Sequence, residues 1–476
     1  MICTILLVLF TVFSLINPAV GDVLGNNARE VAEPTALDLY AHADDGAFAY
    51  ELVNTVESNG FKMHVIDLTS QKWRTEQDVD LAVWKHWLTV YVPKTIQSRI
   101  GLVLVGGGSN PGKAPEEMEQ TMAVAATASK SVVALLGMVP NQPVRFTDED
   151  IARGEDDLIA YTWDKYLKTG DPLWLARLPM TKSVVRAMDA IQLFLDTEEG
   201  GKIDVDSFVV AGGSKRGWTT WTAAAVDRRV VAICPAVIDM LNVVPSFIHH
   251  WNVYGFWAPA VGSYENMGIM EWMRTPEYAE LHKIVEPYSY IDRYKMSKYI
   301  VNSTGDQFFL PDSSQFYWDD LPGPKYLRYV PNTDHGLSSD AYMGLASYLS
   351  AIASGTPLPE YSWSFLGDGS IRVETPDEPI AVKLWQATNP DARDFRKDTI
   401  GAAWTETDLE RGDDGSYTGT VSKPEKGWTA FLVELTFKPT PNGVFKVTSA
   451  VRVVPDVMEH TYRAPEEPPK GFFSGE

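Results

Sequence analysis

FVVAGGSKRGWTTWTAAA, residues 208–225, is the stretch that decides the fold. An apolar run passes through two glycines, presents Ser214, and continues with small residues at helical spacing. A serine on a tight turn between a strand and a helix is typical of a nucleophile elbow, in which small neighbours relieve crowding. The usual motif, G-x-S-x-G, has a small residue where this chain has Arg216, and here glycine follows one place later, at Gly217.

A phosphate-binding loop is the first alternative for this stretch. That loop needs two glycines separated by four residues and then Lys-Ser or Lys-Thr, whereas here the lysine follows the serine. The sequence therefore excludes it. A plain loop that turns into a helix remains the second alternative, and the rest of the chain has to decide against it.

Apolar runs alternate with helical patterns through the middle of the chain. Strands are predicted at residues 88–93, 101–108, 131–140, 207–211, 229–234, 298–306 and 324–336. Helices are predicted at residues 114–129, 181–196, 215–225 and 337–354. Continuous Val/Ile/Leu strands separated by helices indicate an α/β fold with a mostly parallel sheet that is covered on both faces. Chemistry in such sheets collects in the loops at the carboxyl ends of the strands.

The pattern predicts further segments around this sheet. Residues 141–180 and 239–297 are dense in aromatic side chains and predict cap insertions over a site. Short strands without helices predict a β-sandwich domain over residues 362–456. The Pro/Glu-rich tail, residues 457–476, predicts disorder. The α/β domain is therefore expected over residues 22–361.

Residues 1–21 have the pattern of a signal peptide. The apolar run is too short to span a bilayer comfortably, and Ala19 and Gly21 supply the small residues of a cleavage site. A membrane anchor is the alternative, because no Lys or Arg precedes the run. We expect secretion, with no stable membrane anchor after cleavage. Only Cys234 would then remain, so no intramolecular disulfide is expected.

The net charge of −22 argues against nucleic acids and anionic membrane surfaces as partners, because both require basic patches. The hydrophobic fraction of 45% is ample for a large core.

A nucleophilic serine needs a base, and histidine is the side chain whose ordinary pKa lies near neutrality. In the chain order of α/β-hydrolases the histidine follows the acid, near the last strand. Of the eight histidines, only His335 and His460 lie beyond residue 300, and His460 follows the predicted sandwich. His335, in PNTDHGLSS, ends a predicted strand and precedes a helix. It is the candidate base.

The acid should follow the preceding strand. Asp306, in TGDQFF, stands there and could hold the imidazole in one tautomer. Asp312 is the runner-up and could instead cap a helix. Asp334 is a poor candidate because it is adjacent to the histidine in sequence, and Asp239 is a weaker alternative acid or substrate contact.

Oxyanion donors are expected from two places. LVLVGGGSN ends a strand with Gly106, Gly107 and Gly108, where backbone can approach a substrate oxygen closely. The second donor would be the backbone N–H of Lys215, directly after the serine. Such a site needs neither a metal nor an organic cofactor.

These residues lie within longer blocks that resemble the PhoPQ-activated pathogenicity-related protein family of the α/β-hydrolase superfamily. The blocks include VGGGSN, YTWDKYLKTGDPLWLARLPMTKS, AGGSKRGWTTW, TGDQFFLPDSS, PNTDHGL and AVKLWQATNPDARDFR. The resemblance implies the hydrolase fold and a hydrolase-like site at Ser214, Asp306 and His335, but no substrate. The elbow is also similar to the G-C-S-R-x-G of glucuronoyl esterases, with Gly213 and Lys215 in place of Cys and Arg. That similarity implies contact of Lys215 with an acyl oxygen or a substrate carboxylate.

The sequence predicts a secreted serine hydrolase that cleaves an ester or amide through an acyl-enzyme. A small-molecule, carbohydrate-ester or peptide substrate is expected, and the choice between esterase and peptidase stays open. Trp251 and Trp257 of the predicted cap would suit either an apolar acyl group or a sugar ring. The alternative is a binding or signalling protein that keeps the scaffold with little or no catalysis. NST at Asn302 is a formal glycosylation site, but it ends a predicted buried strand, so we expect it unmodified.

Overall fold

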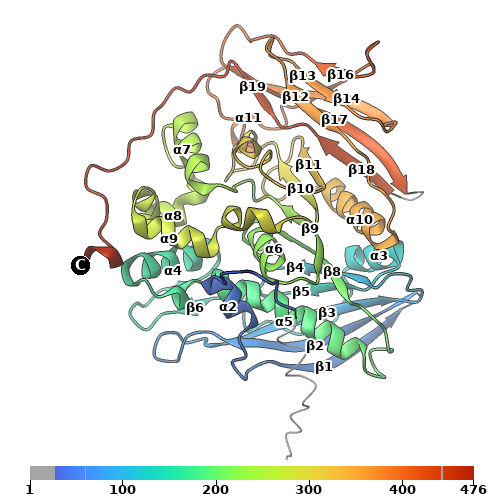
Figure 1. Ribbon diagram of the computed structural model, residues 1–476, viewed down its shortest axis with the longest axis vertical. Coiled ribbons are helices and arrows are strands. Elements are labelled where there is room, and N and C mark those ends of the chain that lie inside the picture. Colours follow the sequence, from blue (N-terminus) through green and yellow to red (C-terminus); the bar gives the residue numbers. More distant parts are fainter. Residues whose placement is uncertain (1–26, 59, 441–442, 476) are drawn as a thin grey trace, which may run out of the picture.

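A computed structural model describes residues 27–58, 60–440 and 443–475 (Figure 1). The predicted signal peptide, residues 1–21, lies outside these residues. Within the described ranges, no helix combines the length and the apolar character that crossing a membrane would require.

Nine strands form one central sheet in the order β1-β2-β3-β5-β4-β8-β9-β10-β11. Their bounds are β1 Ala49–Ser58, β2 Phe61–Lys72, β3 Val83–Pro93, β4 Ile100–Val105, β5 Val133–Leu136, β8 Ser207–Gly213, β9 Val230–Ala236, β10 Ser297–Ser303 and β11 Lys325–Val330. Neighbours from β1 to β5 are antiparallel, and all pairs from β5 to β11 are parallel. This mostly parallel sheet, with a serine turn after β8, is the α/β-hydrolase fold, as the sequence predicted.

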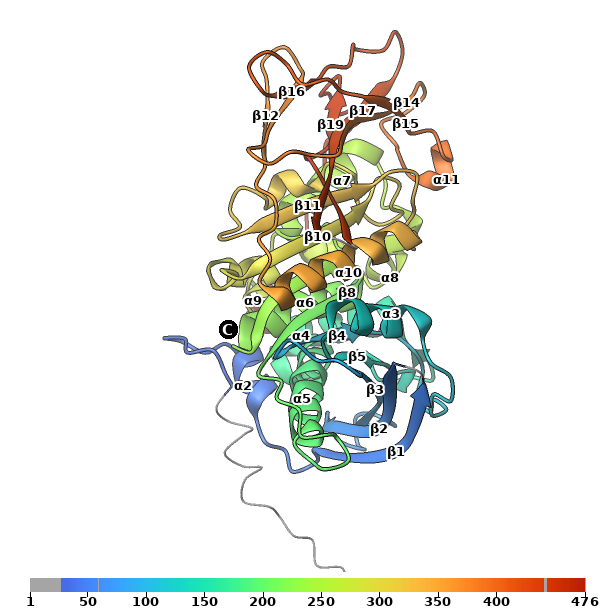
Figure 2. The same cartoon turned by 90° about the vertical axis from the view of Figure 1, so that its right-hand side faces the viewer.

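Helices cover both faces of the sheet. One face carries α2 (Ala36–His42), α5 (Arg177–Leu195) and α6 (Lys215–Val226). The other face carries α3 (Gln120–Ser129) and α10 (Ser339–Ser354). In Figure 2, α10 lies on the side nearer the viewer and runs across the strands. Two separate apolar cores result, because the strand side chains alternate between the faces.

The two aromatic-rich insertions form a helical layer at one side of the sheet, at the left in Figure 1. The first insertion supplies the hairpin β6 (Val144–Arg145) with β7 (Ala152–Arg153), then α4 (Glu155–Thr169) and η1 (Pro172–Trp174). The second supplies α7 (Val243–Tyr254), η2 (Pro259–Val261), α8 (Gly262–Asn266), η3 (Ile269–Trp272), α9 (Pro276–Val285) and η4 (Pro287–Arg293). Trp163 of α4 joins the two insertions, because its ring lies 5.6 Å from that of Tyr264 and 6.5 Å from that of Tyr278.

Two antiparallel sheets follow the α/β domain, at the top of Figure 1. The first has the order β12-β13-β16, and the second has the order β15-β14-β17-β18 with β19 on β17. Their bounds are β12 Ser362–Phe365, β13 Ile371–Glu374, β14 Ala381–Asn389, β15 Thr405–Asp408, β16 Tyr417–Gly419, β17 Trp428–Thr440, β18 Gly443–Thr448 and β19 Arg452–Val454. Strand β18 contacts α10 and β11, so these sheets extend the core on the α10 face. The C-terminal β-sandwich that the sequence predicted is present.

Residues 457–475, which the composition predicted to be disordered, pack on the helical layer instead. They run from β19 past α7 and end beside α4 with η6 (Phe472–Gly475) (Figure 1). The backbone N–H of Tyr462 donates to Asn252 at 2.6 Å, and the Phe472 ring lies 5.6 Å from that of Tyr166. The aromatic side chains in this Pro/Glu-rich segment give it the apolar anchors that its average composition conceals.

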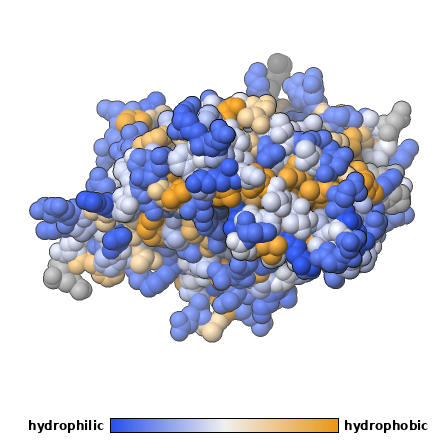
Figure 3. All heavy atoms as spheres, turned by 90° about the horizontal axis from the view of Figure 1, so that it is seen from above, coloured by the Kyte–Doolittle hydropathy of each residue, from blue (hydrophilic) through white to orange (hydrophobic). Residues whose placement is uncertain are grey.

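Seen from above the C-terminal strands, the surface is largely hydrophilic, with one band of hydrophobic side chains (Figure 3). Phe365 on β12 and Val457 after β19 are among the exposed large hydrophobic residues of this part of the chain.

Candidate active site

Ser214 occupies a strained turn between β8 and α6. Its φ is 57° and its ψ is −128°, a region that residues with a side chain rarely adopt. Its N–H donates to the carbonyl of Ala236 on β9 at 2.8 Å, which fixes the turn against the neighbouring strand. Strain of this kind persists where surrounding contacts enforce it, and it is typical of nucleophile elbows.

Two glycines of the elbow are required by close backbone approach. A Cβ on Gly212 would lie 2.6 Å from the carbonyl oxygen of Arg216. A Cβ on Gly217 would lie 2.9 Å from the carbonyl oxygen of Ala236 and 2.8 Å from the Ile238 side chain. Residue 217, rather than residue 216, lies against the end of β9 and must therefore lack a side chain. This explains why the glycine of the motif stands one place later than usual.

Arg216 stands where the usual motif has a small residue, and its side chain contacts three segments of the chain. Its Nε donates to the Val139 carbonyl at 2.6 Å, and its Nη2 donates to Glu155 Oε1 at 2.5 Å. Its guanidinium also covers Gly107, where a Cβ would lie 2.7 Å from Nη2. Burial opposes ionisation of Glu155, but Arg216 and Lys215 lower the pKa of this carboxyl to about 2. The elbow is thereby tied to the loops after β4 and β5 and to the start of α4.

Asp306 and His335 form the predicted pair. His335 Nδ1 lies 3.0 Å from Asp306 Oδ1 and 2.9 Å from Oδ2, and the carboxylate is buried. Asp306 follows β10 and His335 follows β11, so adjacent parallel strands deliver the two side chains to one edge of the sheet. The imidazole packs on the ring of Phe308 at 4.3 Å, and its backbone N–H donates to Gln307 at 3.0 Å.

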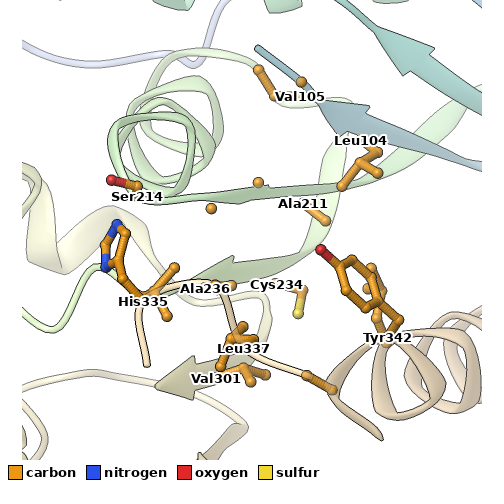
Figure 4. Close-up of a pocket in the computed structure, with 17 residues that line it drawn as sticks. Leu104, Val105, Ala211, Ser214, Cys234, Ala236, Val301, His335, Leu337 and Tyr342 are labelled. Atoms are coloured by element: carbon orange, nitrogen blue, oxygen red, sulfur yellow. The ribbon is translucent and has the colours of Figure 1, made fainter. Parts of the chain in front are cut away.

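The second ring nitrogen of the imidazole, Nε2, is free to bond a substrate or the serine. His335 Nε2 is buried and has no hydrogen-bond partner within the described chain. Ser214 and His335 line the same cavity, and Figure 4 shows the serine hydroxyl and the imidazole at the same end of it. Both predicted side chains are therefore brought to one place, but no hydrogen bond joins Nε2 to the hydroxyl in this conformation.

The runner-up acids have other partners. Asp312 lies 3.0 Å from His249 Nε2 and 2.6 Å from Arg393 Nη2, and all three side chains are buried. Asp334 forms an ion pair with Lys397 at 3.0 Å. In the ranges that the structure describes, no group of three or more His, Cys, Asp or Glu side chains could hold a metal ion.

Asp239 lies in a buried polar cluster beneath the site. It accepts hydrogen bonds from the hydroxyls of Tyr317 and Tyr329, each at 2.5 Å, and burial raises its pKa to about 7.

Asn302, the formal glycosylation residue, is 2% exposed on β10. A glycan could not reach this side chain without opening the sheet.

The glycine loop after β4 contributes differently at its three positions. Gly106 lines the cavity, but its N–H already donates to the carbonyl of Leu136 at 2.8 Å. Gly107 lies under the guanidinium of Arg216, and Gly108 has a φ of +125°, which favours glycine. The amides of Gly107 and Gly108 are the ones left for a substrate oxygen.

Lys215 places its backbone N–H at the first position of α6, where a helix leaves N–H groups without an intrahelical partner. Its ammonium lies 2.9 Å from Glu155 and 3.0 Å from Asp156, and the side chain is buried. Its charge is thus already neutralised by two carboxylates, which disfavours the role in binding a substrate carboxylate that the similarity to glucuronoyl esterases implied.

The cavity next to Ser214 has a volume of about 360 Å³. It lies between the carboxyl ends of β4, β8, β9 and β10 and the start of α10 (Figure 4). The lining residues are Leu104, Val105, Gly106, Ala211, Gly212, Gly213, Ser214, Cys234, Ala236, Val237, Val301, His335, Gly336, Leu337, Ala341, Tyr342 and Leu345. Cys234 is a free, buried cysteine on β9 and also faces this space.

The aromatic residues near the serine differ from those that the sequence suggested. Trp163 and Trp218 line a small second hollow beside Ser214, with their ring centroids 6.1 Å apart. Trp251 and Trp257 instead pack on each other at 5.0 Å, under the C-terminal tail. The sequence around each pair of tryptophans is an ordinary aromatic cluster. It therefore did not indicate which pair would lie beside the serine.

A connection from the C-terminal strands supports both loops that carry the Asp306–His335 pair. It links β14 to β15 and contains α11 (Lys397–Ile400). The Lys397 N–H donates to the Gly305 carbonyl at 3.0 Å, and a Cβ on Gly305 would lie 2.9 Å from that nitrogen. Asn332 exchanges two hydrogen bonds with the Trp404 backbone, at 2.8 and 2.9 Å. Sequence reasoning missed this support, since nothing local marks it.

Comparison with known proteins fits this architecture. Residues 37–396 match the family described as PhoPQ-activated pathogenicity-related protein. Autocrine proliferation repressor protein A of Dictyostelium discoideum is 39% identical over 454 residues, which cover 89% of this chain and 91% of that protein.

The chain is also similar to several solved structures, at lower identity. Acetyl xylan esterase 1 from Thermoanaerobacterium sp. JW/SL YS485 has a TM-score of 0.44 and 14% identity, over 69% of this chain and 98% of that one. Acylaminoacyl peptidase of Pyrococcus horikoshii has a TM-score of 0.39 and 10% identity, over 65% and 49% respectively. The family match covers most of the chain, including the elbow and both loops of the acid–base pair. This chain belongs to the PhoPQ-activated pathogenicity-related protein family.

Proposed function

We propose that this protein is a secreted serine hydrolase that cleaves an ester or amide bond. Ser214 Oγ attacks the carbonyl carbon while His335 Nε2 takes the hydroxyl proton. Asp306 holds the Nδ1–H and stabilises the imidazolium that forms. His335 then gives the proton to the leaving group, and water hydrolyses the acyl-enzyme by the same steps.

The negative charge on the substrate oxygen would be held by backbone donors. The Lys215 N–H at the start of α6 is one, and an amide of the Gly107–Gly108 pair is the other. Because these groups belong to a rigid turn and a loop held by Arg216, they need little reorganisation during the reaction.

One observation carries the proposal. The buried Asp306 carboxylate is bonded to His335 Nδ1, while His335 Nε2 has no hydrogen-bond partner within the described chain and His335 lines the cavity that also holds Ser214. A surface histidine paired for stability alone would not need its free nitrogen to lie beside a strained serine. Catalytic hydrogen bonds are often long in the unliganded enzyme and tighten when substrate binds.

A fluorophosphonate probe tests this role directly. We expect covalent labelling of the folded protein and its loss in Ser214→Ala, because the probe captures an activated serine. Ser207→Ala, at the start of the same strand, is the matched control and should label like the wild type. An unlabelled folded wild type, or a labelled Ser214→Ala, would contradict the proposal. Comparing p-nitrophenyl esters with aminoacyl-coumarins then separates esterase from peptidase.

A second candidate function is favoured by the name of the Dictyostelium relative. That name describes an autocrine repressor of proliferation, which suggests a secreted signalling protein on the same scaffold. If signalling needs no catalysis, Ser214→Ala should keep the full effect of the purified protein on cell proliferation. Loss of the effect in a variant that folds normally would eliminate this candidate.

A further inference from the structure

The cavity beside Ser214 is apolar along almost its whole length. In Figure 4 it runs from Ser214 and His335 at one end to Leu104 and Tyr342 at the other. Apart from Ser214, His335 and the Tyr342 hydroxyl, its lining consists of Gly, Ala, Val and Leu residues and Cys234. No Asp, Glu, Lys or Arg is among the residues that line it.

This lining restricts what the cavity can hold. A sugar or a peptide would lose its hydrogen bonds to water there and find few replacements, at a cost of about 1–3 kcal/mol for each unpaired group. The Cys234 thiol offers little polarity, because burial raises its pKa and keeps it neutral. An apolar group gains free energy over the same surface.

Strand residues and helix α10 form the two long walls of the cavity. Small residues of the strands form one wall, among them Ala211 and Ala236, and α10 forms the other with Ala341 and Leu345. The cavity, with a volume of about 360 Å³, is far larger than an acetyl group needs. It has room for a longer aliphatic chain.

We infer that the cavity binds the acyl part of the substrate, and that this part is an aliphatic chain longer than acetyl. The inference rests on the proposed function, because Ser214 at one end of the cavity would then attack the ester carbonyl at the head of the chain. An acetyl group would leave most of the cavity to water against apolar walls, so short-chain esters are the poorer substrates.

A chain-length series measures this preference. We expect kcat/KM for p-nitrophenyl esters to rise from acetate through butyrate to octanoate, by up to about four-fold per methylene. A profile that is flat, or highest for acetate, overturns the inference.

Filling the cavity tests the location. Leu345→Trp places an indole where the chain should lie, and we expect the octanoate-to-acetate ratio of kcat/KM to fall at least ten-fold. Met343→Trp is the matched control on the same helix, since Met343 is 60% exposed and does not line the cavity. An unchanged ratio in Leu345→Trp, or an equal fall in Met343→Trp, overturns the inference. If Leu345→Trp does not fold, the wild-type chain-length profile decides.

Fluorophosphonate labelling distinguishes a failure of the hydrolase proposal from a failure of the acyl-chain inference. Labelling at Ser214 together with a flat chain-length profile removes the acyl-chain inference and leaves the hydrolase proposal standing. No labelling of the folded wild type removes the hydrolase proposal and this inference with it.

Discussion

Asp306→Asn is the sharpest test of how the acid–base pair works. Both carboxylate oxygens of Asp306 lie within 3.0 Å of His335 Nδ1, and Oδ1 also accepts the Phe308 N–H at 2.8 Å. Asparagine has nearly the same shape and keeps an oxygen for Phe308. Its NH₂ group, however, would face Nδ1 and turn that nitrogen into an acceptor.

The expected loss follows from the tautomer. With Nδ1 accepting, the proton of neutral imidazole sits on Nε2, and that nitrogen can no longer take the serine proton. The imidazolium also loses its buried counter-charge. In serine hydrolases that carry this change the loss is about 10⁴-fold in kcat, or about 5.5 kcal/mol of transition-state stabilisation.

The assay is the second-order rate of fluorophosphonate labelling at pH 7.5, with ester hydrolysis measured beside it. Asp334→Asn is the matched control, because Asp334 is adjacent to the histidine in sequence but bonds Lys397 and the Gly336 N–H. It should stay within a few-fold of the wild type. A rate for Asp306→Asn within ten-fold of the wild type, or an equal loss in Asp334→Asn, would refute the assignment of the acid.

Two predictions concern stability. Arg393→Met should lower the free energy of unfolding in urea by about 3–5 kcal/mol, because it removes the guanidinium that pairs with the buried Asp312 carboxylate and leaves it only the imidazole of His249. Lys397→Met, which removes one partner of a more exposed ion pair, should cost about 1 kcal/mol or less. Equal losses would contradict this. Burial, reinforced by neighbouring positive charge, lowers the pKa of His250 to about 3, and its Nε2 accepts the Ala258 N–H. Unfolding therefore takes up a proton as pH falls below about 6.5, which costs about 2 kcal/mol of stability between pH 7.5 and 5. His250→Gln keeps an acceptor for Ala258 and should remove this part of the acid sensitivity; identical pH slopes in urea unfolding would refute it.

The fold class and the positions of the predicted site residues were accessible from sequence, because each depends on local order. A strand, a turn and a helix are readable around Ser214, and the chain order of α/β-hydrolases then points to the loops after the last two strands. Asp306 and His335 are the residues that those loops offer. Their mutual distance is a consequence of neighbouring parallel strands, which the alternating pattern also predicts.

Other features depend on contacts between distant residues. Arg216 reaches Val139, and Asn332 reaches Trp404, across more than seventy residues of chain in each case. No periodicity marks such partners. Strand β1, which the pattern did not reveal, is a half-exposed edge strand whose burial is too irregular to show a period of two. The tail was misjudged because composition averages over its few aromatic anchors.

The connection between β14 and β15 sets an order in time as well as in space. Synthesis proceeds from the N-terminus, so the elbow and the loops of Asp306 and His335 leave the ribosome before the segment that braces them. We expect a nascent chain to hold its serine without a fixed relay until the last hundred residues have been made and docked.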